Sequence, residues 1–117
     1  MKGMCDMELN KVDKKVEDIK KTAIEKRLTE SISIIPGKTS AYFMCSVEDN
    51  ISFMFHGDKA PTAFVEVKLL GKSTKEAYGN LTAEICTILK EEIGVSPDYC
   101  YVKFEEVEYW GYNNFMF

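Results

Sequence analysis

The chain has 117 residues, of which 45% are hydrophobic and 29% charged, and its formal net charge is -4. This length suits one hydrophobic core, so we expect a single domain over residues 1–117. The acidic balance, with lysines spread through both halves, argues against nucleic acid or an anionic membrane as a partner.

The N-terminal residues, MKGMCDMELN, lack the continuous apolar segment of a signal peptide, and no stretch reaches the length of a membrane span. We therefore expect a cytoplasmic protein. The four cysteines lie far apart within apolar runs and form no C-x-x-C pair, which favours free thiols and predicts no metal site and no cofactor. They are Cys5, Cys45, Cys86 and Cys100.

The first half of the chain reads as strand, helix, strand. We expect a strand over Cys5–Leu9 and then a helix from about Asn10 to Ile34, because apolar residues recur there every three or four positions. An alternating apolar run follows Gly37 and predicts the next strand. The apolar stripe of the helix consists of Val12, Val16, Ile19, Ala23 or Ile24, Leu28 and Ile32.

The second half repeats this order. A strand is expected over Val65–Leu69, a helix from Ser73 to about Ile93, and a further strand from Cys100. Ser73 and Glu76 have the spacing of a capping box at the helix start. The segment IPGKTSAYFMCSVED also aligns without gaps with EIGVSPDYCYVKFEE, and the glycine of each copy is positioned to end a helix.

Two β-α-β units predict an α+β fold in which a four-stranded mixed sheet carries both helices on one face. Alternation along the strands then separates the two faces of the sheet. The face predicted to pack under the helices consists of Cys5, Met7, Leu9, Phe43, Cys45, Val47, Ala63, Val65, Val67, Leu69, Cys100, Val102 and Phe104.

The opposite face of the sheet is mixed in character. If both helices lie on the other side, its large apolar groups would face water, which favours closure by a homo-oligomer. The alternative is that the C-terminal tail folds back over them. This face consists of Met4, Asp6, Glu8, Tyr42, Met44, Ser46, Phe64, Glu66, Lys68, Leu70, Tyr101, Lys103 and Glu105.

Several short segments, in order and at matching spacing, resemble a known family. They are Gly37–Lys38, Met54–Gly57, Pro61, Leu70–Lys72, Val95–Asp98, Tyr101–Val102, Gly111–Asn114 and the final Phe117. On these residues the chain resembles the tautomerase superfamily, and within it proteins of the macrophage migration inhibitory factor (MIF) type. The resemblance implies a homotrimer with pockets at the subunit interfaces and, by analogy, release from the cytoplasm without a signal peptide.

The resemblance also implies a pocket for a small aromatic keto or enol acid such as phenylpyruvate. Lys38 matches a lysine that faces the substrate carboxylate, Leu70 an apolar wall position, and Tyr101 a tyrosine contributed by the neighbouring subunit. The remaining implied pocket positions are Lys103, Trp110, Tyr112 and Phe117.

The start of the chain departs from the family pattern. Such pockets contain an N-terminal proline whose amine shuttles a proton between carbon and oxygen, whereas the prolines here are Pro36, Pro61 and Pro97. Lys2 or Gly3 stands about where that proline would be. We expect the protein to retain Met1, since a lysine in second position hinders its removal.

Three hypotheses remain open. The first is an active tautomerase that uses the amine of Met1 or Lys2 as its base, with a pKa depressed by neighbouring cations. The second is a binding or cytokine-like signalling protein that keeps the pocket but has weak or no tautomerase activity. The third is a ferredoxin-like regulatory domain that binds a small effector and resembles the family only superficially.

Overall fold

The computed structural model describes the backbone of residues 5–12, 16–58 and 60–117, and the side chains of residues 16–58 and 60–117. Four strands form one sheet: β1 (Cys5–Val12), β2 (Phe43–Val47), β3 (Ala63–Leu70) and β4 (Cys100–Val107). The helices are α1 (Asp18–Ser31) and α2 (Lys75–Ile93), and a small hairpin of β5 (Gly111–Tyr112) and β6 (Phe115–Met116) follows the sheet. Short 3-10 turns are η1 (Ile32–Ile34), η2 (Ser40–Tyr42) and η3 (Pro97–Tyr99).

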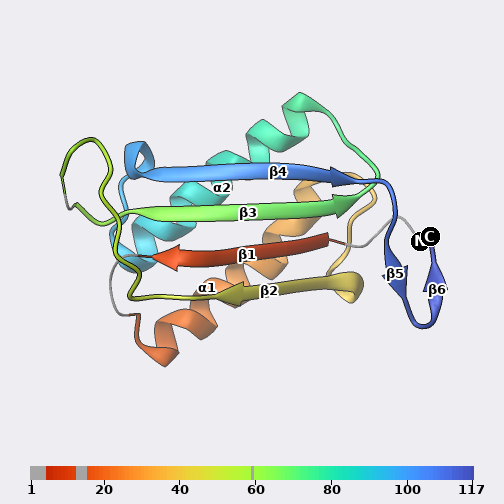
Figure 1. Cartoon of the computed structure of the whole chain (residues 1–117), viewed down its shortest axis with the longest axis horizontal. Helices are drawn as coiled ribbons and strands as arrows, with labels where there is room; N and C mark the ends of the chain where they lie inside the picture. Colours follow the sequence, from red (N-terminus) through yellow and green to blue (C-terminus); the bar gives the residue numbers. More distant parts are fainter. Residues whose placement is uncertain (1–4, 13–15, 59) are drawn as a thin grey trace.

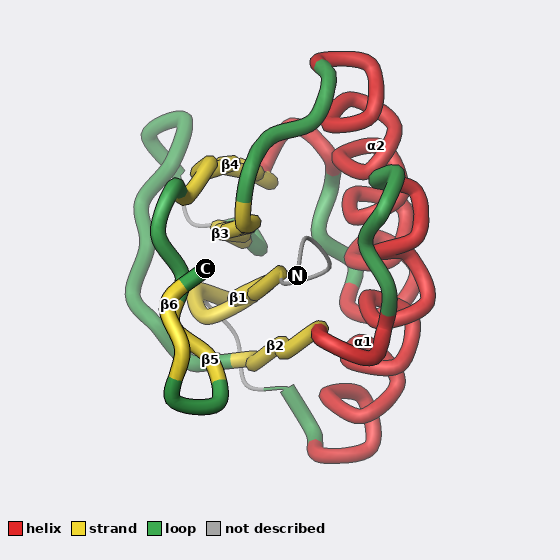
Figure 2. The backbone as a smooth tube through the Cα atoms, turned by 90° about the vertical axis from the view of Figure 1, so that its right-hand side faces the viewer, coloured by secondary structure: helices red, strands yellow, loops and turns green. Residues whose placement is uncertain are grey.

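The sheet has the order β2-β1-β3-β4. Strand β1 runs parallel to β2 and antiparallel to β3, and β3 runs parallel to β4. Each parallel pair is joined through one helix, and both helices cover the same face of the sheet (Figure 1 and Figure 2). The predicted α+β organisation with a helix in each half is therefore confirmed.

The core lies between this sheet and the two helices. Val65, Val67 and Leu69 of β3 are fully buried, and so are Leu28 of α1 and Ile85 of α2. Each such side chain contributes roughly 1.5–3 kcal/mol through removal of its apolar surface from water. Within the described residues, neither helix combines the length and apolarity needed to cross a membrane.

The predicted sheet faces agree with the burial of the described side chains, with one exception. Ala63, Val65, Val67 and Leu69 are buried, and the six predicted core residues of β2 and β4 pack against the same core. Leu70, predicted for the uncovered face, is only 8% exposed. It is the last residue of β3, where the Lys38 side chain reaches its carbonyl group. The side chains of Met4, Cys5, Asp6, Met7, Glu8 and Leu9 lie outside the described ones.

The predicted start of the first helix is wrong. Residues 10–12 belong to β1, and α1 begins only at Asp18. Strand β1 continues because its register with β3 shifts between Glu8 and Lys11, after which pairing resumes through Val12 opposite Ala63. Such a bulge places an extra residue in β1 opposite β3, and the spacing of apolar residues in the sequence does not reveal it.

The apolar stripe of this helix is consequently shorter than predicted. Ile24, Leu28 and Ile32 are buried, but Ile19 is 75% exposed. Val16 is buried although it precedes the helix. Its backbone N–H donates to Asp49 Oδ2 at 2.6 Å, which ties the segment before α1 to the segment after β2.

Helix α2 differs from its prediction only at its first turn. Its N-cap is Thr74, whose Oγ1 accepts the Ala77 backbone N–H at 3.1 Å, so the N-cap lies one residue after the predicted Ser73. The third helical position is then Ala77, whose side chain cannot complete the expected capping box. Gly94 ends the helix with a φ of 72°, as the repeat predicts. Gly37 does not play the same role in the first copy, because the 3-10 turn η1 intervenes and is capped by Ile35.

Candidate functional site

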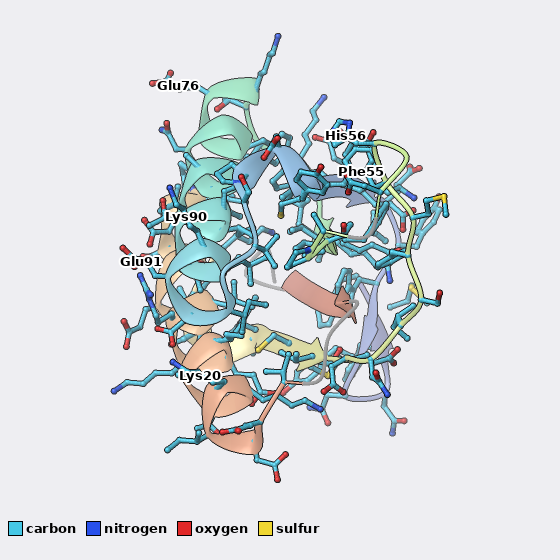
Figure 3. The ribbon with its side chains drawn as sticks, turned by 90° about the vertical axis from the view of Figure 1, so that its left-hand side faces the viewer. Lys20, Phe55, His56, Glu76, Lys90 and Glu91 are labelled. Carbon is cyan, nitrogen blue, oxygen red and sulfur yellow. The ribbon has the colours of Figure 1, made fainter. Side chains whose placement is uncertain are left out.

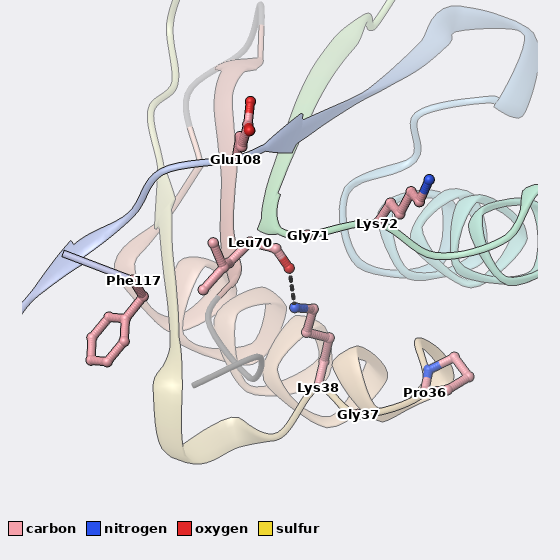
Figure 4. Close-up of a pocket in the computed structure, with 8 residues that line it drawn as sticks. All are labelled: Pro36, Gly37, Lys38, Leu70, Gly71, Lys72, Glu108 and Phe117. Atoms are coloured by element: carbon pink, nitrogen blue, oxygen red, sulfur yellow. Dashed lines mark hydrogen bonds between the residues drawn. The ribbon is translucent and has the colours of Figure 1, made fainter.

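A cavity of about 630 Å³ lies at one end of the sheet, where three loops and the C-terminal residue meet (Figure 4). The loop before β2 contributes residues 36–38, the β3–α2 connection contributes residues 70–72, and the segment after β4 contributes Glu108. Phe117 closes one side. The chain thus brings residues distant in sequence to one edge of the sheet.

Two glycines with left-handed backbone conformations shape the loops of this cavity. Gly37 has a φ of 83° and Gly71 a φ of 80°, values that a residue with a Cβ adopts only with strain. Gly71 turns the chain sharply at the end of β3, and its N–H donates to the Val107 carbonyl at 2.9 Å. This bond aligns the ends of β3 and β4, so that Glu108 follows beside the loop that carries Lys72.

Lys38 is the most buried polar group of the cavity, with 6% of its surface exposed. Its ammonium group donates to the Leu70 carbonyl oxygen at 2.7 Å and points across the cavity from the opposite loop (Figure 4). Burial of a cation is costly unless it is hydrogen-bonded, and this contact fixes where the ammonium lies. Lys38 therefore presents a positioned positive charge rather than a freely moving one.

The β3–α2 connection is held in place by Tyr78 of α2. The Ser73 N–H donates to its hydroxyl oxygen at 2.8 Å, and that hydroxyl donates to Glu106 Oε2 at 2.6 Å. The Tyr78 ring stacks on Phe104 with a centroid separation of 4.6 Å. These contacts connect the loop beside Lys72 to both α2 and β4.

The cavity combines apolar walls with charged groups. Leu70, Pro36 and Phe117 provide apolar surface, and the charged side chains among the described lining residues are those of Lys38, Lys72 and Glu108. Such a site suits a small ligand with an apolar body and an anionic group. Among the side chains that the structure describes, no cluster of three or more metal-binding residues is found.

Of the pocket residues predicted from sequence, the structure brings Lys38, Leu70 and Phe117 together in this cavity. Trp110 is adjacent to it, because its backbone pairs with Phe117 through two hydrogen bonds of 2.9 and 3.4 Å. Tyr112 lies in the hairpin, where its ring contacts Tyr42 edge to face at 5.9 Å. Binding of a ligand by any of these residues stays a prediction.

Tyr101 and Lys103 lie apart from the cavity of their own chain. They are opposite Phe64 and Glu66 on β3, and Tyr101 is 57% exposed on the uncovered face of the sheet. The candidate bases Met1 and Lys2 lie outside the described residues. Seen from within one chain, the predicted pocket is therefore divided between two places.

An aromatic cluster surrounds Tyr101 on this uncovered side. Phe55 lies 4.9 Å from the Tyr101 ring and 4.0 Å from His56, and its ring meets Tyr99 at 5.9 Å. His56, for which the sequence predicts no role, lies with Nε2 2.9 Å from the Asp98 carbonyl oxygen. Figure 3 shows Phe55 and His56 on the opposite side of the molecule from the charged helix residues Lys20 and Glu91.

A second contact fastens the Phe55 loop to η3. The Tyr99 hydroxyl donates to Asp58 Oδ2 at 2.6 Å. This hydrogen bond lowers the pKa of the Asp58 carboxyl and raises the pKa of the Tyr99 hydroxyl, because it favours the charged acid and the neutral phenol. The loop thereby supports Tyr101 from one side.

Sequence reasoning assigned no site role to Lys72 or Glu108, although both line the cavity. The order of strands nevertheless indicates that the two residues lie close together. Since β3 and β4 are parallel neighbours, the residues that follow both strands reach the same edge of the sheet. Gly71–Lys72 and Glu108 follow those strands directly.

Comparison with known proteins agrees with this fold. The chain matches the family model described as Macrophage migration inhibitory factor (MIF) over residues 4–114. No curated protein sequence matches it. Because the family model covers nearly the whole chain, the third hypothesis, of a superficial likeness, is wrong.

Solved structures show the same fold at low sequence identity. Leishmania major MIF2 has a TM-score of 0.91 and 21% identity, with all of both chains covered. The MIF-like protein of Entamoeba histolytica has a TM-score of 0.81 and 22% identity, with 97% of this chain and 99% of that chain covered. The MIF homologue of Prochlorococcus marinus has a TM-score of 0.83 and 22% identity over 97% and 98% of the two chains. Family model and fold together establish that the chain belongs to the macrophage migration inhibitory factor family.

Proposed function

We propose that this protein is a MIF-like trimer that binds a small aromatic keto or enol acid in an interface pocket and has weak or no keto–enol tautomerase activity. It would act as a binding or cytokine-like signalling protein. The cavity around Lys38, Leu70 and Phe117 is the observation that supports ligand binding. The first four residues, MKGM, contain no proline, which supports weak or no tautomerase activity.

The chemistry of the cavity supports an acid as the ligand. Lys38 places a buried cation at the cavity, where its hydrogen bond to the Leu70 carbonyl oxygen fixes its position, and a positive charge there favours an anionic ligand such as a carboxylate. Phe117 and Leu70 provide apolar surface for an aromatic ring. Loss of a charge-assisted contact typically costs 1.5–3 kcal/mol, or about 10- to 100-fold in affinity.

The binding test is a titration with phenylpyruvate, followed by the fluorescence of Trp110, the only tryptophan. Trp110 is a suitable reporter because its backbone pairs with Phe117 at the cavity. We expect Lys38→Met to weaken binding by about 10- to 100-fold. Lys26→Met, at an exposed position of α1, is the matched control and should bind as wild type does.

Two further results bear on this test. Phe117→Ala removes the aromatic wall and should also weaken binding while leaving the Lys38 contact intact. If Lys38→Met binds phenylpyruvate as tightly as Lys26→Met, with both variants folded by circular dichroism, the cavity is not the acid-binding site.

Self-association is supported by the uncovered face of the sheet. Tyr101, Met44 and Tyr42 are 57%, 66% and 39% exposed on or beside this face, and it lies opposite the two helices. A trimer that closes these faces would bury them and bring Tyr101 and Lys103 of one subunit toward a neighbour's cavity. Native mass spectrometry should therefore give a trimer, and a monomer at micromolar concentration would contradict this assembly.

Active tautomerisation with an amine base is the second candidate. It is favoured by Lys38 and Lys72, since two cations in one cavity would depress the pKa of an amine that enters it. Enolisation of phenylpyruvate that is lost in Lys2→Ala would support Lys2 as the base.

We further propose a cytoplasmic protein that is released without a signal peptide.

A further inference from the structure

The oxygen that holds the Lys38 ammonium belongs to a peptide unit at the end of β3. The Leu70 carbonyl oxygen accepts the Lys38 ammonium at 2.7 Å. On the other side of the same planar peptide, the Gly71 N–H donates to the Val107 carbonyl oxygen at 2.9 Å. The orientation of this one peptide therefore determines where the Lys38 ammonium lies in the cavity (Figure 4).

A second contact holds the loop that follows this peptide. Gly71 has a left-handed φ of 80°, and a glycine restricts backbone rotation only weakly. Two residues later the Ser73 N–H donates at 2.8 Å to the Tyr78 hydroxyl oxygen, and that hydroxyl donates at 2.6 Å to Glu106 Oε2. Glu106 directly precedes Val107 in β4, so both contacts hold the loop against the same stretch of the sheet.

The Tyr78 side chain is well placed to hold the loop, because packing fixes its own ring. The ring is partly buried against the hydrophobic core and stacks on Phe104 of β4 with the centroids 4.6 Å apart. A hydroxyl that donates to a carboxylate is polarised and becomes a better acceptor, so the Glu106 contact strengthens the contact to the loop. Tyr78 is not among the described residues that line the cavity, so it acts on the cavity only through other residues.

We propose that Tyr78 is a positioning residue for the cavity, which fixes the Lys38 ammonium through the Leu70–Gly71 peptide and thereby favours acids over neutral ligands. This inference rests on the proposed function and deepens it, since it assigns part of the preference for an acid to a residue outside the cavity. The attraction between an ammonium and a carboxylate depends on their separation and alignment. Apolar contact with an aromatic ring is non-directional and tolerates a small shift.

The binding test compares phenylpyruvate with its methyl ester, which has the same aromatic ring but no carboxylate. Trp110 fluorescence follows both titrations. We expect Tyr78→Phe to weaken phenylpyruvate binding by about three- to tenfold, the size of one lost hydrogen bond, and ester binding by less than about twofold. Ala83→Gly is the matched control, because glycine at this exposed position of α2 destabilises the helix without touching the loop. It should leave both affinities unchanged.

Further variants test the route from Tyr78 to the cation. Once Lys38→Met has removed the ammonium, adding Tyr78→Phe should weaken phenylpyruvate binding little further, because two residues that act as a unit are not additive. Glu106→Gln and Glu106→Leu both remove the negative charge, but only glutamine keeps an oxygen that can accept the Tyr78 hydroxyl. Glu106→Gln should therefore retain more of the preference for the acid over the ester than Glu106→Leu, and equal preferences would count against the route.

A measurement without ligand separates this inference from the proposed function. Brief labelling with acetic anhydride, followed by peptide mass mapping, reports how accessible each lysine amine is. Relative to Lys26, we expect the buried Lys38 to react about three- to tenfold faster in Tyr78→Phe than in Ala83→Gly.

Equal Lys38 labelling in these two variants overturns the positioning role, and so does equal weakening of acid and ester binding by Tyr78→Phe. If the wild-type protein binds neither ligand, the proposed function fails. Faster Lys38 labelling in Tyr78→Phe would then still support the hold of Tyr78 on the ammonium, and equal labelling would still overturn it.

Discussion

Tyr78→Phe tests how the loop beside the cavity is held. The change removes only the hydroxyl group, which accepts the Ser73 N–H at 2.8 Å and donates to Glu106 Oε2 at 2.6 Å. The ring and its stacking on Phe104 remain. Each lost hydrogen bond contributes about 0.5–1.5 kcal/mol net, and because Glu106 is solvent-exposed we expect a total of about 1–2 kcal/mol.

The assay is urea unfolding at a fixed protein concentration, followed by circular dichroism and by Trp110 fluorescence. With a slope of roughly 2 kcal/mol/M, this loss lowers the midpoint by about 0.5–1 M. Hydrogen exchange of the Ser73 amide should become faster, because this amide loses its acceptor. Tyr109→Phe is the matched control, since Tyr109 is 71% exposed, and it should change stability by less than about 0.5 kcal/mol. Equal midpoints for the two variants would refute the role assigned to Tyr78.

Two further predictions concern the core and the pH dependence of stability. Ile85→Ala should destabilise the protein by about 2–5 kcal/mol because Ile85 is fully buried, whereas Ile19→Ala should cost little because Ile19 is 75% exposed; similar losses in urea unfolding would contradict the assigned core. The Val16 N–H and the Lys21 ammonium hold the pKa of the Asp49 carboxyl below its usual range. A lowered folded-state pKa stabilises the protein above the unfolded-state pKa, and this contribution is lost as pH falls through the folded-state value. Unfolding midpoints of Asp49→Asn should therefore decline less steeply in acid than those of wild type, and parallel declines would count against the Asp49 contact.

Much of the architecture follows from local patterns in the sequence. The alternation along β3 places Val65 and Val67 in the core, and the stripe of α2 places Leu81 and Ile85 there. These patterns are reliable because one face of each element is fully covered, so that a shift of one residue in a strand would expose the whole set. The end of α2 was equally predictable, since Gly94 adopts the left-handed conformation expected of a helix C-cap.

The N-terminal boundary was not predictable from the same signals. Val12 and Val16 fit the period of a helix, yet Val12 pairs with Ala63 in the sheet. The bulge between Glu8 and Lys11 depends on a partner strand more than fifty residues away, so no local propensity records it. The N-cap of α2 was also not predictable from local sequence. The Ser73 N–H, which a capping box would pair with Glu76, donates instead to the Tyr78 hydroxyl oxygen.

The candidate site was only partly accessible to sequence reasoning. Lys38, Leu70 and Phe117 were named from a family resemblance and meet in the cavity. Lys72 and Glu108 were missed because their proximity arises from the parallel alignment of β3 and β4.

The most direct test of the central proposal is a phenylpyruvate enolisation assay on protein whose N-terminal residues have been verified by sequencing, with binding measured on the same sample. We predict saturable binding that depends on Lys38, together with enolisation little or no faster than in buffer. Rapid, saturable turnover by that verified protein would contradict the proposal that the pocket binds its ligand without efficient proton transfer.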